Sequence, residues 1–85
     1  MTIMSQPSRP TWTVRSGEDL GKVVAEIRAR RGLTQEQLAV RGGLSRAYLA
    51  QIERGRTGSL IEHILRLLRR MGATITVTLD GDGNP

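Results

Sequence analysis

The stretch from residue 33 to 56, LTQEQLAVRGGLSRAYLAQIERGR, constrains the fold more than any other part of this chain. Thr34 and Gln37 form an S/T-x-x-E/Q capping box, which predicts that a helix begins there. The pair Gly42–Gly43 ends that helix after about two turns, because glycine takes up the left-handed backbone that closes a helix. Ser45 is a favourable N-cap for a second short helix. The stretch therefore predicts two short helices joined by a tight glycine turn.

The packing of this unit can be predicted position by position. Two short helices joined in this way cross at a steep angle. The small side chain of Ala39 is expected to lie where the second helix crosses over the first. Gly43 is expected to have a positive φ. Either Tyr48 or Leu49 is expected on the inward face of the second helix together with Ile52. Leu44, Leu49 and Ile52 are expected to hold the unit against the helices on either side.

One further helix is expected on each side of this unit. The first begins at a box formed by Ser16 and Asp19 and ends near residue 31, and the last begins at a box formed by Ser59 and Glu62 and ends near residue 71. Apolar side chains cover an arc of about 160° of the last helix, which is wide for a helix that covers one small core. The arc comprises Leu60, Ile61, Ile64, Leu65, Leu67, Leu68 and Met71.

Residues 73–79 alternate threonine with large aliphatic side chains, which predicts a β-strand. A strand needs a partner for its backbone donors and acceptors. The partner is either the same strand of a second copy or the weaker candidate at residues 11–15; we expect the second copy, and the two pairings are not exclusive. The fold class is therefore mainly α, with four helices and a C-terminal strand that pairs across a dimer. The expected dimerisation residues are Leu67, Met71, Ile75, Val77 and Leu79.

The expected organisation is an arm over residues 1–15, a helical domain over 16–72, a dimerisation strand over 73–80 and a tail over 81–85. With 85 residues and no cysteine, the domain is small and has no disulfides to reinforce it. It contains a single histidine, His63, and no recognisable arrangement of catalytic or metal-binding side chains, so we expect no enzyme activity, no metal and no cofactor. No apolar run is long enough for a membrane span, which favours a cytoplasmic protein.

Charge points to the kind of partner. Thirteen basic residues against eight acidic ones give a net charge of +5, and twelve of the thirteen are arginine. Arginine forms bidentate contacts with phosphate and with guanine. A polyanion is therefore the expected partner.

The order of these residues resembles a known family. The pattern T-Q-x-x-L-A-x-x-x-G-h-S-x-x-x-h-x-x-h-E-x-G, which starts at Thr34, is similar to the helix-turn-helix of the Xre/Cro family, which includes the lambda-repressor-like phage repressors. Residues 20–72 correspond to the usual first four helices of that family. The resemblance implies a DNA-binding domain that inserts its second short helix into the major groove.

The resemblance also implies roles for individual residues. Bases would be contacted by Arg46 (guanine), Ala47 (a thymine methyl) and Gln51 (adenine). Phosphates would be contacted by Gln35, Ser45, Tyr48, Arg54 and Arg56. Arg28 and Glu53 match family positions that form an ion pair between the first and third helices, so both are expected to be structural.

The four helices followed by a strand resemble HipB-like antitoxins in particular. That resemblance implies a homodimer bound to a palindromic double-stranded operator, repression of its own operon, location on the nucleoid and binding to a HipA-like kinase toxin. Two alternatives remain: a stand-alone Xre-type regulator without a toxin, and a protein-interaction module that does not bind DNA.

Overall fold

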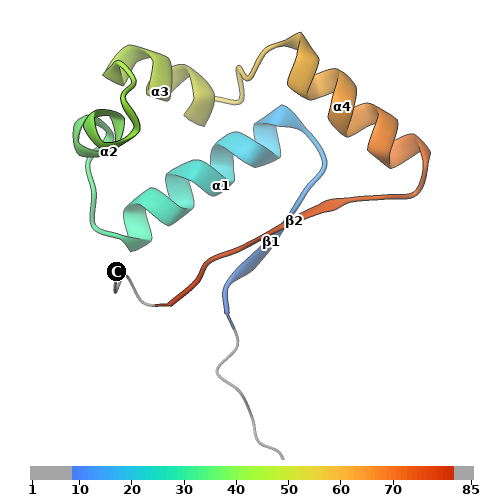
Figure 1. The fold of residues 1–85 in the computed structure, drawn as a ribbon, viewed down its shortest axis with the longest axis horizontal. Coiled ribbons are helices and arrows are strands. Elements are labelled where there is room, and N and C mark those ends of the chain that lie inside the picture. The colour runs from blue at the N-terminus through green and yellow to red at the C-terminus, as the bar shows by residue number, and fades with distance from the viewer. Residues whose placement is uncertain (1–8, 82–85) are drawn as a thin grey trace, which may run out of the picture.

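The computed structural model describes residues 9–81 and contains four helices and two strands in that part of the chain (Figure 1). In chain order the elements are β1 (Thr11–Val14), α1 (Gly17–Arg30), α2 (Gln35–Gly42), α3 (Arg46–Glu53), α4 (Ser59–Arg70) and β2 (Ile75–Thr78). The prediction of a mainly helical fold, with four helices followed by a strand, is confirmed.

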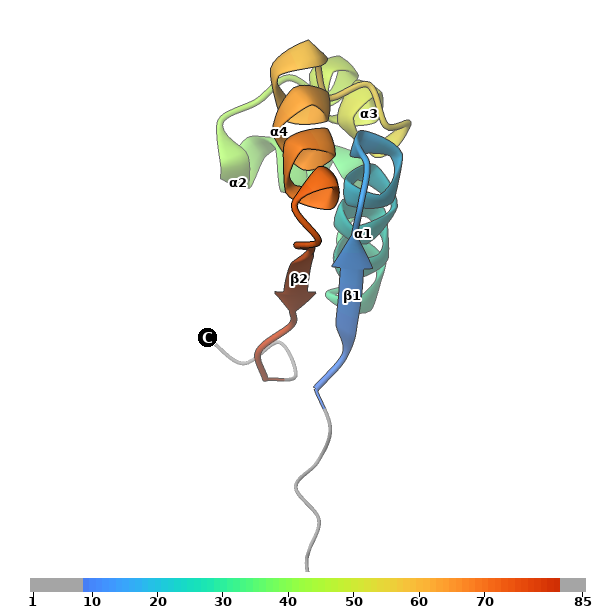
Figure 2. The same cartoon turned by 90° about the vertical axis from the view of Figure 1, so that its right-hand side faces the viewer.

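The two strands pair with each other, antiparallel, within the same chain. Figure 2 shows them side by side and running in opposite directions. Thr11 lies opposite Thr78, and Val14 lies opposite Ile75. The segment before α1, the weaker of the two candidates, therefore supplies a partner strand for β2, and pairing of β2 with a second copy stays a prediction. Residues 11–14 consequently belong to the folded domain instead of a flexible arm, whereas residues 1–8 of that arm and 82–85 of the tail lie outside the described residues.

The sheet packs through one face because alternate residues of a strand point to the same side. Trp12 and Val14 share that face, and Val14 is only 1% exposed. Val77, opposite Trp12, is half-buried against the same cluster. The guanidinium of Arg30, at the end of α1, lies 5.5 Å from the centre of the Trp12 ring, a cation–π distance.

The core of the described chain is small. Val14, Val23 and Leu65 are its buried members, so the sheet, α1 and α4 meet there. Its half-buried surroundings are Trp12, Leu20, Ile27, Ile61 and Val77. A second buried point, made by Ala39 and Leu49, lies under the α2–α3 crossing.

Most of the predicted helix starts are present as local hydrogen bonds. The Ser16 hydroxyl accepts a hydrogen bond from the backbone N–H of Asp19. The Asp19 carboxylate accepts from the backbone N–H of Arg15 instead of that of Ser16, so the capping box is only half formed. At α2 both halves of the Thr34–Gln37 capping box are formed.

The predicted start of α4 is wrong. Its N-cap is Gly58, with φ 91°, and Ser59 is the first helical residue, so the serine makes no cap. The Glu62 carboxylate instead accepts a hydrogen bond of 3.1 Å from the backbone N–H of Gly17, at the start of α1. The first N–H groups of every helix lack a partner within that helix. The Glu62 carboxylate can therefore accept from the N-terminus of α1 as readily as from the N-terminus of α4. This contact ties α4 to α1.

Candidate nucleic-acid interface

The turn between α2 and α3 has the geometry that the two glycines predict. Gly43 is left-handed, with φ 70°, and the next residue, Leu44, donates its backbone N–H to the Ala39 carbonyl at 2.9 Å. Ser45 then caps α3 by accepting from the N–H of Tyr48. Ala39 is buried beneath the crossing, as its small size predicts.

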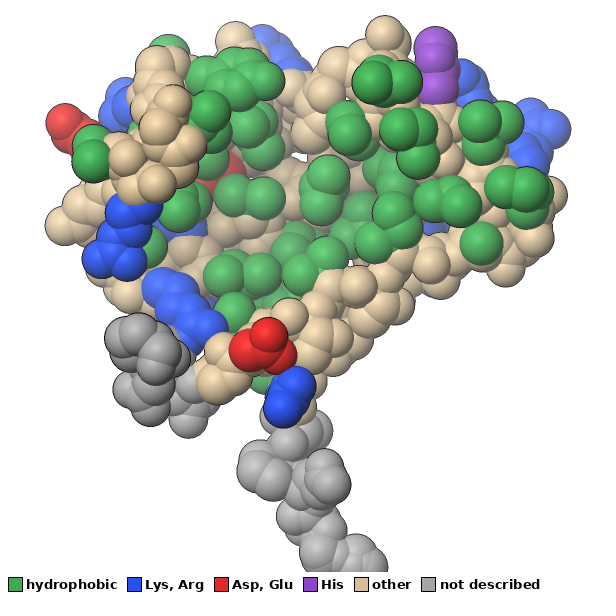
Figure 3. Space-filling model, in the orientation of Figure 1, with side chains coloured by type: hydrophobic (Ala, Val, Ile, Leu, Met, Phe, Trp, Pro, Cys, Tyr) green, Lys and Arg blue, Asp and Glu red, His purple; other side chains and the backbone are tan. Residues whose placement is uncertain are grey.

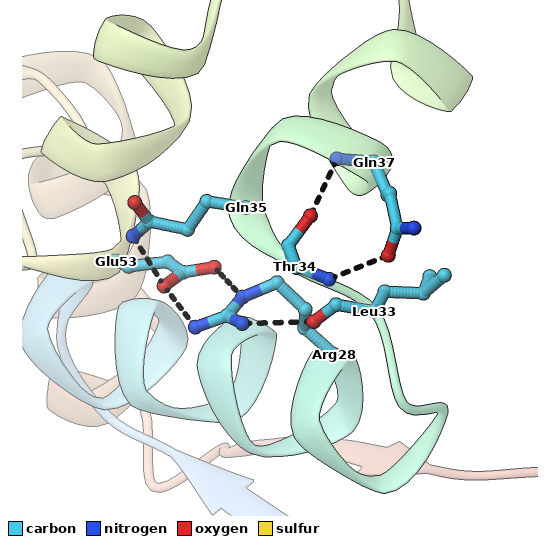
Figure 4. Close-up of polar contacts among 6 residues, drawn as sticks. All are labelled: Arg28, Leu33, Thr34, Gln35, Gln37 and Glu53. Carbon is cyan, nitrogen blue, oxygen red and sulfur yellow. Dashed lines mark hydrogen bonds and ion pairs between the residues drawn. The ribbon is translucent and has the colours of Figure 1, made fainter.

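An ion pair fixes α3 against α1. The Arg28 guanidinium donates to both carboxylate oxygens of Glu53, at 2.8 and 3.0 Å, and a third bond of 3.0 Å goes to the Leu33 carbonyl (Figure 4). Only 7% of the Glu53 side chain is exposed. Hydrogen bonds from Arg28 hold the pKa of the Glu53 carboxyl below its ordinary value despite the opposing effect of burial, and the same contact raises the pKa of Arg28. The pair is thus charged at neutral pH and geometrically well matched.

Gln35 joins this pair, which the sequence pattern did not predict. Its side-chain amide, at the start of α2, donates to Glu53 at 2.9 Å (Figure 4). Three helices therefore converge on one carboxylate. The second amide hydrogen of Gln35 and its oxygen are not used in this bond, so a phosphate contact remains compatible with it.

A close approach of backbones also positions α3, and the sequence pattern did not predict it. A methyl group at Gly21, in the middle of α1, would lie 2.9 Å from the Gly55 nitrogen and would overlap the Ile52 carbonyl oxygen. The end of α3 thus rests directly on α1. An isolated glycine inside a helical pattern was the available signal, because such a residue commonly marks close packing.

The outer face of α3 is open. Arg46, Ala47 and Gln51 are all exposed on it. The residues expected to contact phosphate surround this face: Ser45, Tyr48, Arg54 and Arg56 are exposed, and Gln35 is half-buried. The structure thus places the predicted site residues on α3 and its two ends, except Gln35, which lies at the start of α2.

The expected dimerisation residues are divided. Leu67, Met71 and Ile75 are exposed, whereas Val77 and Leu79 are half-buried within their own chain.

No group of three or more acidic, histidine or cysteine side chains within residues 9–81 is arranged to hold a metal. Within the same range no helix is long and apolar enough to cross a bilayer.

Two short capped helices cross at a glycine turn; the second packs against α1 and α2 on its inner face and is exposed to solvent on its outer face. This arrangement defines a helix-turn-helix DNA-binding domain. The chain belongs to the Helix-turn-helix family (HTH_3), whose model matches residues 24–77, more than half of its length.

Three curated relatives agree with this family. The chain is 34% identical over 55 residues to an uncharacterized HTH-type transcriptional regulator, y4dJ, of Sinorhizobium fredii; the match covers 65% of this chain and 71% of that protein. It is 36% identical over 61 residues to the HTH-type transcriptional regulator SlrR of Bacillus subtilis, covering 71% of this chain but only 38% of SlrR. It is 34% identical over 56 residues to an uncharacterized HTH-type transcriptional regulator of Haemophilus influenzae, covering 66% of this chain and 57% of that protein.

No solved structure matches the chain at comparable significance. The family and these relatives identify the chain as a non-enzymatic, DNA-binding regulator of transcription.

Proposed function

We propose that the chain is a repressor that recognises a palindromic operator as a homodimer, with α3 in the major groove. The observation that carries this proposal is the asymmetry of α3. Its inner side is held by the contact of Glu53 with Arg28 and Gln35, while Arg46, Ala47 and Gln51 are exposed on the outer side. A helix held in this way presents its side chains to base edges at a defined angle.

Each exposed residue has a chemical role in this proposal. Arg46 donates to the O6 and N7 acceptors of guanine, Ala47 contacts a thymine methyl, and Gln51 reads a further base. A good bidentate contact contributes about 1–3 kcal/mol of discrimination between bases. The phosphate contacts are assigned to Gln35, Ser45, Tyr48, Arg54 and Arg56.

Binding to a duplex taken from upstream of the protein's own gene tests the operator and autoregulation together. We expect a preference of about a thousandfold or more over a scrambled duplex at physiological salt. The double variant Arg46→Ala/Gln51→Ala should lose this preference, whereas Arg66→Ala, on the exposed side of α4, should keep it. Equal and salt-sensitive binding of the native protein to both duplexes would contradict operator recognition at this site.

The homodimer is supported by a second apolar stripe on α4. The inner face of this helix, made by Ile61, Leu65 and Leu68, is buried or half-buried. An outer stripe with the spacing of a heptad seam is exposed and lies in the hydrophobic area that Figure 3 shows over α4. Its members are Leu60 (70% exposed), Ile64 (43%), Leu67 (62%) and Met71 (72%). The wide apolar arc predicted for α4 thus consists of two faces. Only the inner face packs against the core of the chain.

The free energy available from burying this stripe is of the same order as the cost of association. Burying a large aliphatic side chain completely contributes about 1.5–3 kcal/mol, so the four partly exposed members of the stripe offer about 4–7 kcal/mol from each chain. Two chains together offset most or all of an association cost of about 4–15 kcal/mol. Ile75 on β2 is also exposed, and the edge of β2 away from β1 would face its twin in the dimer.

Sedimentation across the micromolar range tests the dimer. Leu67→Glu should shift the protein to monomer because it places a charge in the centre of the stripe. Arg66→Glu introduces the same residue one position away, on an exposed site outside the stripe, and should leave the dimer intact. Circular dichroism should show both variants folded, and a native protein that is monomeric throughout this range would contradict the proposal.

The finer proposal is that this cytoplasmic repressor is an antitoxin that binds a HipA-like kinase. It rests on the resemblance of the order of four helices and a strand to HipB-like antitoxins. Co-expression with the product of the neighbouring gene should give a stable complex and relieve any toxicity of that product. A regulator whose operon encodes no such kinase would instead be a stand-alone Xre-type regulator.

A further inference from the structure

The end of α3 forms a Schellman motif that sets two side chains of the interface beside each other. Gly55, with φ 88°, donates its N–H to the Ile52 carbonyl at 2.9 Å, and Arg56 donates its N–H to the Gln51 carbonyl at 3.0 Å. In this motif the residue after the glycine is brought back over the last turn of the helix. The backbone of residue 56 is therefore fixed next to residue 51, whatever their side chains are.

The side chains of these two residues make a further contact. Nη1 of the Arg56 guanidinium donates to Oε1 of Gln51 at 3.2 Å, on the exposed surface of α3. A guanidinium has only donors, so it binds the oxygen of the amide and leaves the NH₂ group outward. Gln51 is thus presented with its oxygen turned toward Arg56 and its two donor hydrogens available.

We propose that Arg56 is a positioning residue that determines which base Gln51 recognises. This inference rests on the proposed function, because it assumes that Gln51 reaches a base in the major groove. A free amide pairs with adenine by accepting from N6 and donating to N7. When its oxygen is turned toward Arg56, the amide cannot face one adenine with both its oxygen and its NH₂ group, and the donors that Gln51 and Arg56 direct outward match the two acceptors O6 and N7 of guanine. The base opposite Gln51 is therefore guanine instead of the adenine expected from Gln51 alone.

This role is additional to the phosphate contact assigned to Arg56 above, and it can be measured separately from that contact. Loss of an arginine that only binds phosphate weakens binding about equally for all sequences and reduces the salt dependence. Loss of an arginine that orients Gln51 changes the preference at one base pair and leaves the others unchanged.

The experiment is selection of bound duplexes from a randomised pool by the full chain at fixed salt. The base pair read by Gln51 is identified as the position whose preference disappears in Gln51→Ala. We expect the native protein to select guanine there, and Arg56→Ala to shift the guanine-to-adenine ratio at that position by about tenfold towards adenine. Arg56→Ala keeps the Schellman backbone bonds, which do not use the side chain.

Arg54→Ala is the matched control. Arg54 is also exposed at the end of α3, and its backbone N–H bonds to the Ala50 and Gln51 carbonyls. Its removal should weaken binding without changing the base preference. If Arg56→Ala behaves as Arg54→Ala does, or if the native protein selects adenine at the Gln51 position, the inference is wrong while operator recognition stands. If the native protein enriches no sequence at all, the proposed function itself is wrong.

Discussion

Replacement of Gly21 by alanine tests whether direct backbone contact with α1 sets the position of α3. A Cβ at this position would lie 2.9 Å from the Gly55 nitrogen and 3.1 Å from the Glu53 carbonyl carbon, with the Ile52 oxygen closer still. These neighbours are backbone atoms, which cannot rotate away as a side chain does. The end of α3 must therefore move if the methyl group is to fit.

The expected size follows from two opposing terms. Overpacking a tight contact costs about 1–3 kcal/mol, and replacing glycine by alanine within a helix gains up to about 1 kcal/mol. The net loss is therefore up to about 3 kcal/mol, and each kcal/mol lowers Tm by about 4–8 °C in a domain of this size. Because the displaced segment is the end of α3, affinity for the operator should fall further than the loss of folded protein explains.

Gly42→Ala is the matched control. Gly42 is also helical, but a methyl there would meet nothing closer than the Leu44 side chain at 3.9 Å. The same substitution should therefore raise Tm by a few degrees, since only the helix term applies. Thermal unfolding followed by circular dichroism measures both variants. A Gly21→Ala protein as stable as Gly42→Ala would refute the close-contact argument.

Three further predictions concern hydrogen bonds at the ends of helices and between helices. Acid should destabilise the protein because the pKa of Glu53 is lower in the folded chain than in the unfolded chain. The contribution of Glu53 to the free energy of unfolding is therefore complete above about pH 4.3, the ordinary pKa of a glutamate, and it is lost as the pH falls through the pKa that Glu53 has in the folded chain. Urea unfolding at pH 7 and at about pH 3.5 should accordingly show a smaller difference in Glu53→Gln than in the native protein, and equal differences would contradict this. Thr34→Ala removes the cap of α2 and should cost about 1 kcal/mol in urea unfolding; a loss near zero would mean that the capping box adds nothing. Glu62→Ala should cost about 1 kcal/mol because the Gly17 N–H loses its acceptor, whereas Glu62→Gln keeps an acceptor oxygen and should lose less; equal losses would contradict that explanation.

Local interactions explain how much of the fold was predictable from the sequence. The capping box of Thr34 and Gln37, the cap at Ser45 and the left-handed Gly43 all involve partners within three to five residues. Their geometry follows from the chemistry of the side chain and the adjacent backbone. The helix-turn-helix and the open face of α3 were therefore predictable before any tertiary structure was known. The Arg28–Glu53 contact was expected only through resemblance to a family.

Long-range partners were decided by the tertiary structure. Glu62 had equally good acceptor roles at its own helix and at α1, and only packing directs it to Gly17, 45 positions away. The same holds for Gln35, whose amide reaches Glu53 across 18 positions. An alternating pattern shows that residues 75–78 form a strand but not which strand pairs with it, because backbone hydrogen bonds do not depend on side-chain identity. Local chemistry thus sets where α2 and α3 start and stop and which face of α3 is polar, whereas long-range packing selects which distant groups hydrogen-bond to one another.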